Sequence, residues 1–253
     1  MNIAGLSAIV TGGGSGMGAA TARHLASLGA KVTVLDVNKD AVEQTARDIG
    51  GLGLVCDVTN GDSAEAAFEQ ARAAHGPARI AVNCAGVAPA QRIVGRDGAM
   101  PLDAFRKVIE INLIGSFNIL RLAAADMSKL DLLESGERGV IINTASVAAY
   151  EGQVGQAAYA ASKGGVVALT ICAARDLARS AIRVMTIAPG LIGTPMLLGM
   201  PQEVQDSLAA TVPFPKRFGR PDEYARLVQH ILENEMLNGE TIRLDGAIRM
   251  APQ

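Results

Sequence analysis

Short runs of apolar and β-branched residues alternate with longer helical runs from one end of the chain to the other. Most of the short runs end at Asp, Asn or Thr, which is typical of buried strands that lead into polar turns. The predicted strands cover residues 6–11, 31–36, 53–58, 80–83, 139–144, 182–187 and 240–244.

The helical runs lie between these strands, and Gly29 and Gly50 follow two of them in the position of a C-terminal cap. Regular alternation of strands and helices favours a parallel sheet with helices on both faces. We therefore expect residues 1–253 to form a single Rossmann-type, doubly wound α/β domain of about seven strands. The predicted helices cover residues 21–28, 40–49, 63–75, 102–127, 156–178 and 221–233.

Composition narrows the class of protein. The 253 residues are 49% hydrophobic and carry a net charge of −2, which gives no sign of nucleic-acid or membrane-surface binding. The N-terminus lacks a basic region before its first strand, and no apolar run is expected to be long enough to cross a bilayer. The three cysteines are odd in number and far apart, so we expect reduced thiols and a cytoplasmic protein. No metal site is expected, because none of the three histidines has a partner nearby in sequence.

A glycine-rich turn, TGGGSGMG, joins the first strand to the first helix. Glycines at Gly12, Gly16 and Gly18 would let the backbone approach a pyrophosphate, whose charge the helix N-terminus attracts. Ser15 and Met17 belong to the same turn. Such a turn is weak evidence for a nucleotide by itself, but its position between a strand and a helix predicts a nucleotide site.

Asp36 ends the second predicted strand. A carboxylate there can accept hydrogen bonds from both ribose hydroxyls of an adenosine and would repel a 2′-phosphate. No Arg or Lys occurs in the glycine turn or at positions 37 and 38, so NAD is expected rather than NADP. The alternative is that Asp36 is a solvated turn residue.

Two further strand ends should lie at the same edge of the sheet, because ligands of open α/β sheets bind at the carboxyl ends of the strands. Asp57 and Val58 end the third strand and are expected near the adenine. The fourth strand is followed by small residues that permit close contact with a cofactor: Asn83, Cys84, Ala85 and Gly86.

Ser146, Tyr159 and Lys163 form the candidate catalytic group. Tyr159 and Lys163 are four residues apart on a predicted helix and therefore share a face. A tyrosine pKa of about 10 is too high for proton exchange near neutrality, and a nearby ammonium lowers it. The Ser146 hydroxyl, at the end of a strand, can hold the same substrate oxygen. The alternative is chance, since Tyr-x-x-x-Lys is a common helical spacing.

These motifs together resemble the short-chain dehydrogenase/reductase family, in the expected order and over essentially the whole chain. The resemblance implies a catalytic tetrad of Asn112, Ser146, Tyr159 and Lys163. Tyr159 would be the general acid/base, Ser146 would stabilise the substrate oxygen, and Lys163 would lower the tyrosine pKa and hold the nicotinamide ribose. Asn112 would hold a water for proton relay. The cofactor would also meet Pro189, Gly190, Ile192 and Thr194 after the sixth strand.

Within the family, stretches such as NTASVAAYEGQVGQAAY and NGETIRLDGAIRM are similar to the type 2 short-chain 3-hydroxyacyl-CoA dehydrogenases. That subgroup implies an acyl-CoA substrate, NAD, a homotetramer, and a Gln153 that reaches the substrate. The segment 87–101 departs from it by being shorter and less basic. The alternatives are a hydroxysteroid or other secondary-alcohol dehydrogenase, an acetoacetyl-CoA or 3-oxoacyl reductase, and a scaffold protein that keeps only the fold.

Residues 191–218 follow the sixth strand and are expected to form a lid over the substrate. Their apolar side chains suit an adaptable pocket, or else pack on the core. Lys216, Arg217 and Arg220 would meet CoA phosphates or form a solvated cluster. The helix 156–178 is apolar almost all round, so one side should be covered by the sheet and the other by a partner subunit. The apolar residues of the lid are Met196, Leu197, Leu198, Met200, Val212 and Phe214.

Overall fold

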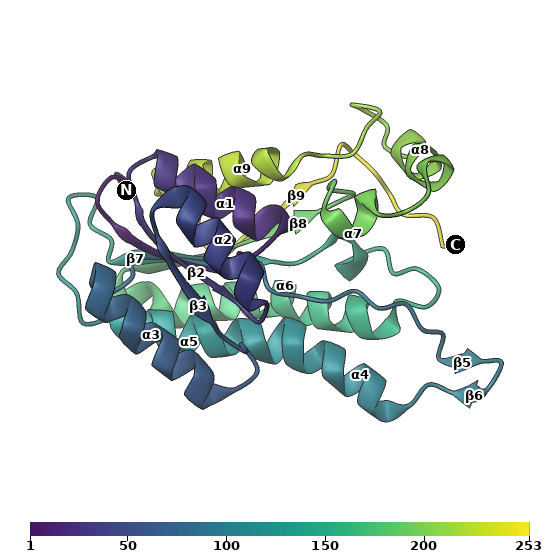
Figure 1. Cartoon of the computed structure of the whole chain (residues 1–253), viewed down its shortest axis with the longest axis horizontal. Coiled ribbons are helices and arrows are strands. Elements are labelled where there is room, and N and C mark those ends of the chain that lie inside the picture. Colours follow the sequence, from purple (N-terminus) through teal and green to yellow (C-terminus); the bar gives the residue numbers. More distant parts are fainter. Residues whose placement is uncertain (253) are drawn as a thin grey trace.

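A computed structural model describes residues 1–252, with the exception of the Met196 side chain. It contains a seven-stranded sheet in the order β3-β2-β1-β4-β7-β8-β9, in which every neighbouring pair is parallel. The chain winds outward in two directions from β1 and β4. The predicted doubly wound α/β fold is confirmed (Figure 1). The strands are β1 Ser7–Thr11, β2 Lys31–Asp36, β3 Leu52–Val55, β4 Ile80–Asn83, β7 Gly139–Thr144, β8 Ile182–Pro189 and β9 Thr241–Leu244.

Helices cover both faces of the sheet, with α1, α2 and α9 on one face and α3, α5 and α6 on the other (Figure 1). Each face has its own apolar core: Leu25 and Ile231 belong to the first, and Phe68 and Met127 to the second. The helices are α1 Gly16–Ser27, α2 Lys39–Ile49, α3 Gly61–His75, α4 Leu102–Ile109, α5 Gly115–Met127, α6 Ala157–Leu177, α7 Pro195–Leu198, α8 Gln202–Ala210 and α9 Pro221–Glu233, with short 3-10 turns at Val147–Ala149 and Ala178–Ser180.

The third strand ends at Val55, earlier than predicted, because polar contacts turn the chain out of the sheet. The Cys56 N–H still donates to the Asp36 carbonyl at 2.9 Å. The Asp57 carboxylate then accepts from both the N–H and the hydroxyl of Thr59, and this closes a turn before α3. Asp57 and Val58 therefore belong to a loop at the strand end.

The long helix predicted over 102–127 contains a π-helical turn, Glu110–Ile114, between α4 and α5. Such turns are frequent at functional sites, and this one carries Asn112. Three short elements were not predicted. They are the hairpin of β5 (Val94–Gly95) and β6 (Gly98–Ala99), and the helices α7 and α8. The helix α7 begins at Pro195, and a proline at the first helical position favours a helix start.

Two helical segments, Leu102–Met127 and Ala157–Ser180, are apolar and long enough to cross a membrane by length and composition, contrary to the sequence expectation. Core helices pass the same test, and both segments cover the sheet, with 50% and 39% of their most apolar windows buried. The remaining faces leave Phe117 48% and Ile171 40% exposed. These helices therefore keep an apolar face that the single chain does not cover.

A buried ion pair links β8 to the loop before β7, and its arginine also binds the end of α9. The Arg183 guanidinium donates to Glu137 at 2.6 Å and to the carbonyls of Ile231, Leu232 and Leu237 at 2.8–3.0 Å. Both charged side chains are almost completely buried. The carbonyls at a helix end have no partner within the helix, so Arg183 supplies one there.

Candidate active site

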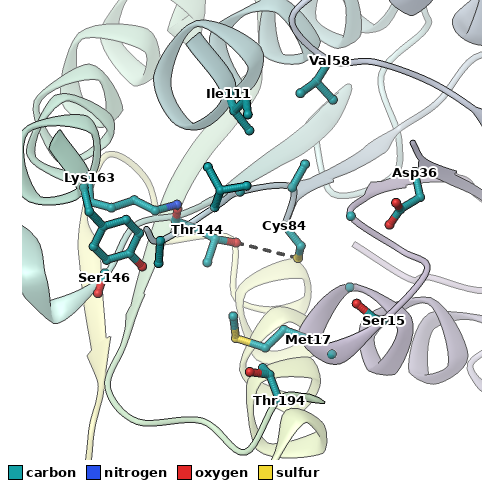
Figure 2. A pocket seen from close by; sticks show the side chains of 18 of the residues that line it. Ser15, Met17, Asp36, Val58, Cys84, Ile111, Thr144, Ser146, Lys163 and Thr194 are labelled. Atoms are coloured by element: carbon teal, nitrogen blue, oxygen red, sulfur yellow. Dashed lines mark hydrogen bonds between the residues drawn. The ribbon is translucent and has the colours of Figure 1, made fainter. Parts of the chain in front are cut away.

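A cavity of ≈ 950 Å³ lies at the carboxyl ends of the strands, where the chain winds away in opposite directions from β1 and β4. This is where open α/β sheets bind ligands. Figure 2 shows Asp36 and Ser15 at one end of the cavity and Ser146 and Lys163 at the other. The predicted site residues that line it are Gly12, Ser15, Gly16, Met17, Gly18, Asp36, Asp57, Val58, Cys84, Ala85, Gly86, Ser146, Tyr159, Lys163, Pro189, Gly190, Ile192 and Thr194.

The glycine turn packs so closely against its own backbone and the loop after β4 that side chains would not fit at Gly12 or Gly18. A Cβ at Gly12 would lie 2.7 Å from the Ala85 nitrogen, and one at Gly18 would overlap the Gly12 carbonyl. Gly16 has a positive φ of 51°, which favours glycine. The 12-residue helix α1 begins there with no acidic residue in its first turn. Its N-terminus is therefore free to attract phosphate charge.

Asp36 is fixed at the end of β2 by two main-chain donors. The Gly14 N–H donates to Oδ2 and the Asn38 N–H to Oδ1, each at 3.0 Å. The carboxylate faces the cavity beside the glycine turn (Figure 2). Among the described residues, the cations that line the cavity come from α4 and α6, and none comes from the glycine turn or the β2–α2 junction. This environment fits ribose hydroxyls better than a 2′-phosphate.

One face of α4 and the π turn also lines the cavity, and sequence reasoning missed it. Its members are spaced three or four residues apart, which is a helical face and was the available signal. Ile111 lies near Val58 (Figure 2), and together they give this part of the cavity an apolar wall. Arg106 pairs with Asp103 at 3.0 Å. The residues are Asp103, Arg106, Lys107, Glu110 and Ile111.

Asn83 is not among the residues that line the cavity, although it was predicted to meet the cofactor. Its side chain is buried and joins neighbouring elements instead. The amide donates to Asn143 Oδ1 at 2.9 Å and to the Ser116 carbonyl at 3.2 Å. Asn83 therefore fixes β4 against β7 and α5 just beneath the cavity floor.

Ser146, Tyr159 and Lys163 meet at the far end of the cavity. Ser146 follows β7 and accepts a hydrogen bond from the Ala148 N–H at 3.1 Å, which fixes its hydroxyl. Tyr159 and Lys163 lie on consecutive turns of α6, and the Lys163 ammonium is 5.9 Å from the Tyr159 ring centre. The predicted convergence of a strand end and a helix face is therefore present in the structure.

The protonation of this group differs from the sequence expectation. Burial raises the pKa of Tyr159, and hydrogen bonding with Ser146 opposes the rise. The Lys163 ammonium donates to the Thr144 carbonyl at 2.7 Å rather than to the Tyr159 phenol. Burial lowers the pKa of Lys163 itself to about 8. Without a cofactor, Tyr159 is therefore a protonated acid.

Asn112 lies behind the catalytic group and is not part of the cavity wall. Its side chain is fully buried. It accepts from the Val87 N–H at 2.8 Å and donates to the Val87 carbonyl at 2.9 Å and to Ser162 at 3.0 Å. A Cβ at Gly86 would lie 3.1 Å from Asn112 Oδ1 and 3.5 Å from Lys163 Nζ. Asn112 thus holds the loop after β4 against α6, close to the lysine.

Gln153, predicted to reach the substrate, does not line the cavity. Its amide donates to the Ala251 carbonyl at 2.9 Å, and the Val154 N–H donates to the Pro252 carbonyl at the same distance. The C-terminal tail competes for this side chain, and sequence spacing gives no sign of that contact.

The 191–218 segment covers the cavity only with its first part. Leu191, Pro195 and Leu197 join Ile192 and Thr194 in the wall. Val212 is buried, whereas Phe214 is 82% exposed. Arg217 pairs with Glu223 at 2.7 Å, so it is neither solvated alone nor free for a phosphate. The Met196 side chain lies outside the described residues.

The fold, the glycine turn and the buried Ser-Tyr-Lys group define a dinucleotide-dependent α/β oxidoreductase. The family model described as short chain dehydrogenase matches residues 7–204. The chain belongs to the short-chain dehydrogenase family and is an oxidoreductase that uses a nicotinamide cofactor.

Relatives with similarity over nearly the whole chain include 3-hydroxyacyl-CoA dehydrogenase type-2 from Bos taurus, which is 52% identical, with 99% of this chain and 98% of the relative covered. The Drosophila melanogaster protein of the same name is 48% identical, with coverage of 96% and 97%. The crystal structure of 3-hydroxyacyl-CoA dehydrogenase type-2 from Mycobacterium avium has a TM-score of 0.94 and 45% identity, with 98% of each chain covered.

Proposed function

We propose that the protein interconverts 3-hydroxyacyl-CoA and 3-oxoacyl-CoA with NAD as the cofactor. The observation that carries the proposal is one cavity with Asp36 and the glycine turn at one end and Ser146, Tyr159 and Lys163 at the other. Relatives of about 50% identity that carry the 3-hydroxyacyl-CoA dehydrogenase type-2 name support the substrate class.

The residues divide the reaction between them. A nicotinamide cofactor held by the glycine turn and Asp36 would supply the hydride acceptor for C3 of the alcohol, or the hydride donor for the ketone. Tyr159 takes the hydroxyl proton during oxidation and returns it during reduction, while Ser146 holds the same oxygen. Burial keeps the Tyr159 phenol protonated before the cofactor binds. The phenol can therefore donate the proton that reduction of the ketone requires. A positive charge nearby favours the phenolate, so an oxidised nicotinamide would shift the tyrosine toward its base form.

NAD is proposed over NADP because of Asp36. Replacing Asp36 by alanine together with Val37→Arg should move the preference toward NADP, as shown by kcat/KM with each cofactor. Loss of the carboxylate lifts the repulsion of a 2′-phosphate, and a guanidinium can pair with it. Val37 is 67% exposed, so the new side chain has room. The control is Met236→Arg, a position that is 92% exposed and does not line the cavity; an equal change in this control, or an unchanged preference in the double variant, would contradict the role of Asp36.

Thioesters are expected to be better substrates than free 3-hydroxy acids. A carboxylate that enters beside the apolar residues Leu191, Ile192 and Leu197 loses its hydration without a clear partner. A thioester is neutral, and its carrier can remain at the cavity mouth and add remote binding energy. The assay follows NADH oxidation with acetoacetyl-CoA, free acetoacetate and a bulky ketosteroid. A steroid or simple ketone that exceeds the thioester tenfold in kcat/KM would favour the secondary-alcohol alternative.

We also propose a homotetramer in which the exposed faces of α5 and α6 are subunit contacts. Apolar surface is left by Phe117 on α5, by Ile171 on α6 and by Ile114 at the end of the π-helical turn before α5, and contact with another copy would bury it. The first part of the 191–218 segment would act as the lid over the acyl group, because it already lines the cavity.

A further inference from the structure

Tyr224 is a buried polar group that the proposed chemistry does not use. It lies in the first turn of α9 and is 0% exposed. Its hydroxyl lies 2.7 Å from Thr144 Oγ1. A buried phenol generally has a hydrogen-bond partner, and here the partner is the last residue of β7, at the wall of the active-site cavity.

The direction of these hydrogen bonds follows from the number of protons. Thr144 Oγ1 lies 2.5 Å from the Asn83 carbonyl, which can only accept, so the single Thr144 proton is used there. Tyr224 therefore donates to Thr144. The Cys84 sulfur is 3.7 Å from the Thr144 oxygen (Figure 2) and 3.7 Å from the Tyr224 oxygen. The Cys84 proton has Tyr224 as the acceptor. Burial raises the pKa of Cys84 and of Tyr224, which keeps both donors protonated.

Thr144 also holds the catalytic lysine, through its main chain. The Lys163 ammonium donates to the Thr144 carbonyl at 2.7 Å, and this is its only hydrogen bond within the described part of the chain. Lys163 is 4% exposed. A buried ammonium depends on its acceptors, because desolvation disfavours the charge. The position of the Thr144 carbonyl therefore helps to determine the pKa of Lys163, because this carbonyl accepts a hydrogen bond from the ammonium.

We propose that Tyr224 is a positioning residue of the active site: its hydroxyl fixes Thr144 so that the Thr144 carbonyl accepts the Lys163 ammonium. This inference rests on the proposed role of the Lys163 ammonium in lowering the tyrosine pKa and holding the nicotinamide ribose. The connection crosses the sheet, since Tyr224 packs in the core of the α1 and α9 face and Lys163 lies on α6 on the other face. The first turn of α9 is itself anchored, because Glu223 accepts from the Arg220 N–H and pairs with Arg217, each at 2.7 Å.

The test compares Tyr224→Phe with Thr170→Val. Both remove a buried hydroxyl, but Thr170 bonds to Thr186 at 2.6 Å, away from Lys163. The measurement is kcat/KM for NADH-dependent reduction of acetoacetyl-CoA across pH, because this ratio reports the pKa values of the free enzyme. In the wild type it should fall as pH rises through about 8, where Lys163 loses its proton.

Tyr224→Phe should move this fall to lower pH by about half a unit to one unit and lower kcat by about 3- to 10-fold, as expected for one lost hydrogen bond. Hydrogen bonding to the ammonium favours the charged form, so a displaced acceptor lowers the pKa of Lys163. Thr170→Val should show a comparable loss of stability and the wild-type pH profile. A Tyr224→Phe profile that matches this control overturns the inference.

Thr144→Val keeps the test decisive if Tyr224→Phe does not fold. It removes the Tyr224 partner but retains the carbonyl, so the same shift is expected. In the variant that combines Tyr224→Phe with Thr144→Val, the two shifts of the pH profile should not add, because both act through the one hydrogen bond between these side chains. Additive shifts would contradict an effect of Tyr224 that passes through Thr144. A wild-type enzyme without NADH-dependent reduction would instead contradict the proposed function, a different result from an active enzyme whose pH profile ignores Tyr224.

Discussion

Tyr159→Phe is expected to lower turnover by roughly 10²–10⁴-fold while the affinity for NADH changes little. General acid–base groups contribute about that factor, and the phenol acts in proton transfer. The replacement keeps the ring, so the packing against Lys163 at 5.9 Å is preserved. The measurement combines kcat for acetoacetyl-CoA reduction with the NADH dissociation constant from fluorescence.

Tyr150→Phe is the matched control, because Tyr150 is 49% exposed and its ring lies 5.4 Å from the Arg243 guanidinium, outside the cavity wall. It should leave kcat unchanged. Lys163→Ala should damage both turnover and cofactor affinity, since the ammonium has two proposed roles. A Tyr159→Phe enzyme that keeps more than about a tenth of the wild-type rate would falsify the general-acid assignment.

Arg183→Met should lower the free energy of unfolding by about 3–5 kcal/mol, the cost of breaking a buried ion pair by removing one partner. The change removes the 2.6 Å partner of the buried Glu137, which keeps only the Met1 ammonium at 3.1 Å, and it removes the donor that serves the carbonyls at the end of α9. Denaturant unfolding of the wild type and the variant measures this difference, which is a large part of the 5–15 kcal/mol typical of a domain.

Two further variants separate burial from charge. Arg121→Met removes an exposed pair with Glu65 at 3.2 Å and should cost about 0–1 kcal/mol. Replacing Arg183 and Glu137 together by Met and Leu should recover only part of the loss, because the Arg183–Glu137 pair is then removed as a whole but the buried Met1 ammonium loses Glu137, its partner at 3.1 Å. A single Arg183→Met variant as stable as the Arg121→Met control would show that the pair contributes nothing net.

The site could be predicted from sequence wherever a residue's place follows from its position in an element. Gly12, Asp36 and Ser146 stand at the ends of strands, and parallel strands bring such ends to one edge of the sheet. Tyr159 and Lys163 follow from the helical repeat in the same way. These predictions needed only the alternation of elements, and all five residues line one cavity.

Asn83 and Gln153 lie outside the cavity wall because a tertiary contact decides the hydrogen-bond partner of each side chain. Asn83 has the right position at a strand end, but its side chain bonds to Asn143 beneath the cavity. Gln153 is held by the Ala251 carbonyl of a tail that is distant in sequence. No local pattern reveals such a competitor for a side chain.

The sequence by itself determined the doubly wound sheet, the edge at which ligands bind, and the residue types at that edge, because strand and helix periodicity is local. The tertiary structure alone decided the protonation of the catalytic tyrosine and lysine. The pKa of Tyr159 is raised, and that of Lys163 is lowered to about 8, by burial that many distant side chains create together. The Thr144 carbonyl, held beside Tyr224, takes the ammonium that the sequence alone would have assigned to the tyrosine. Desolvation and hydrogen bonding depend on every neighbour in three dimensions, which spacing along the chain does not encode.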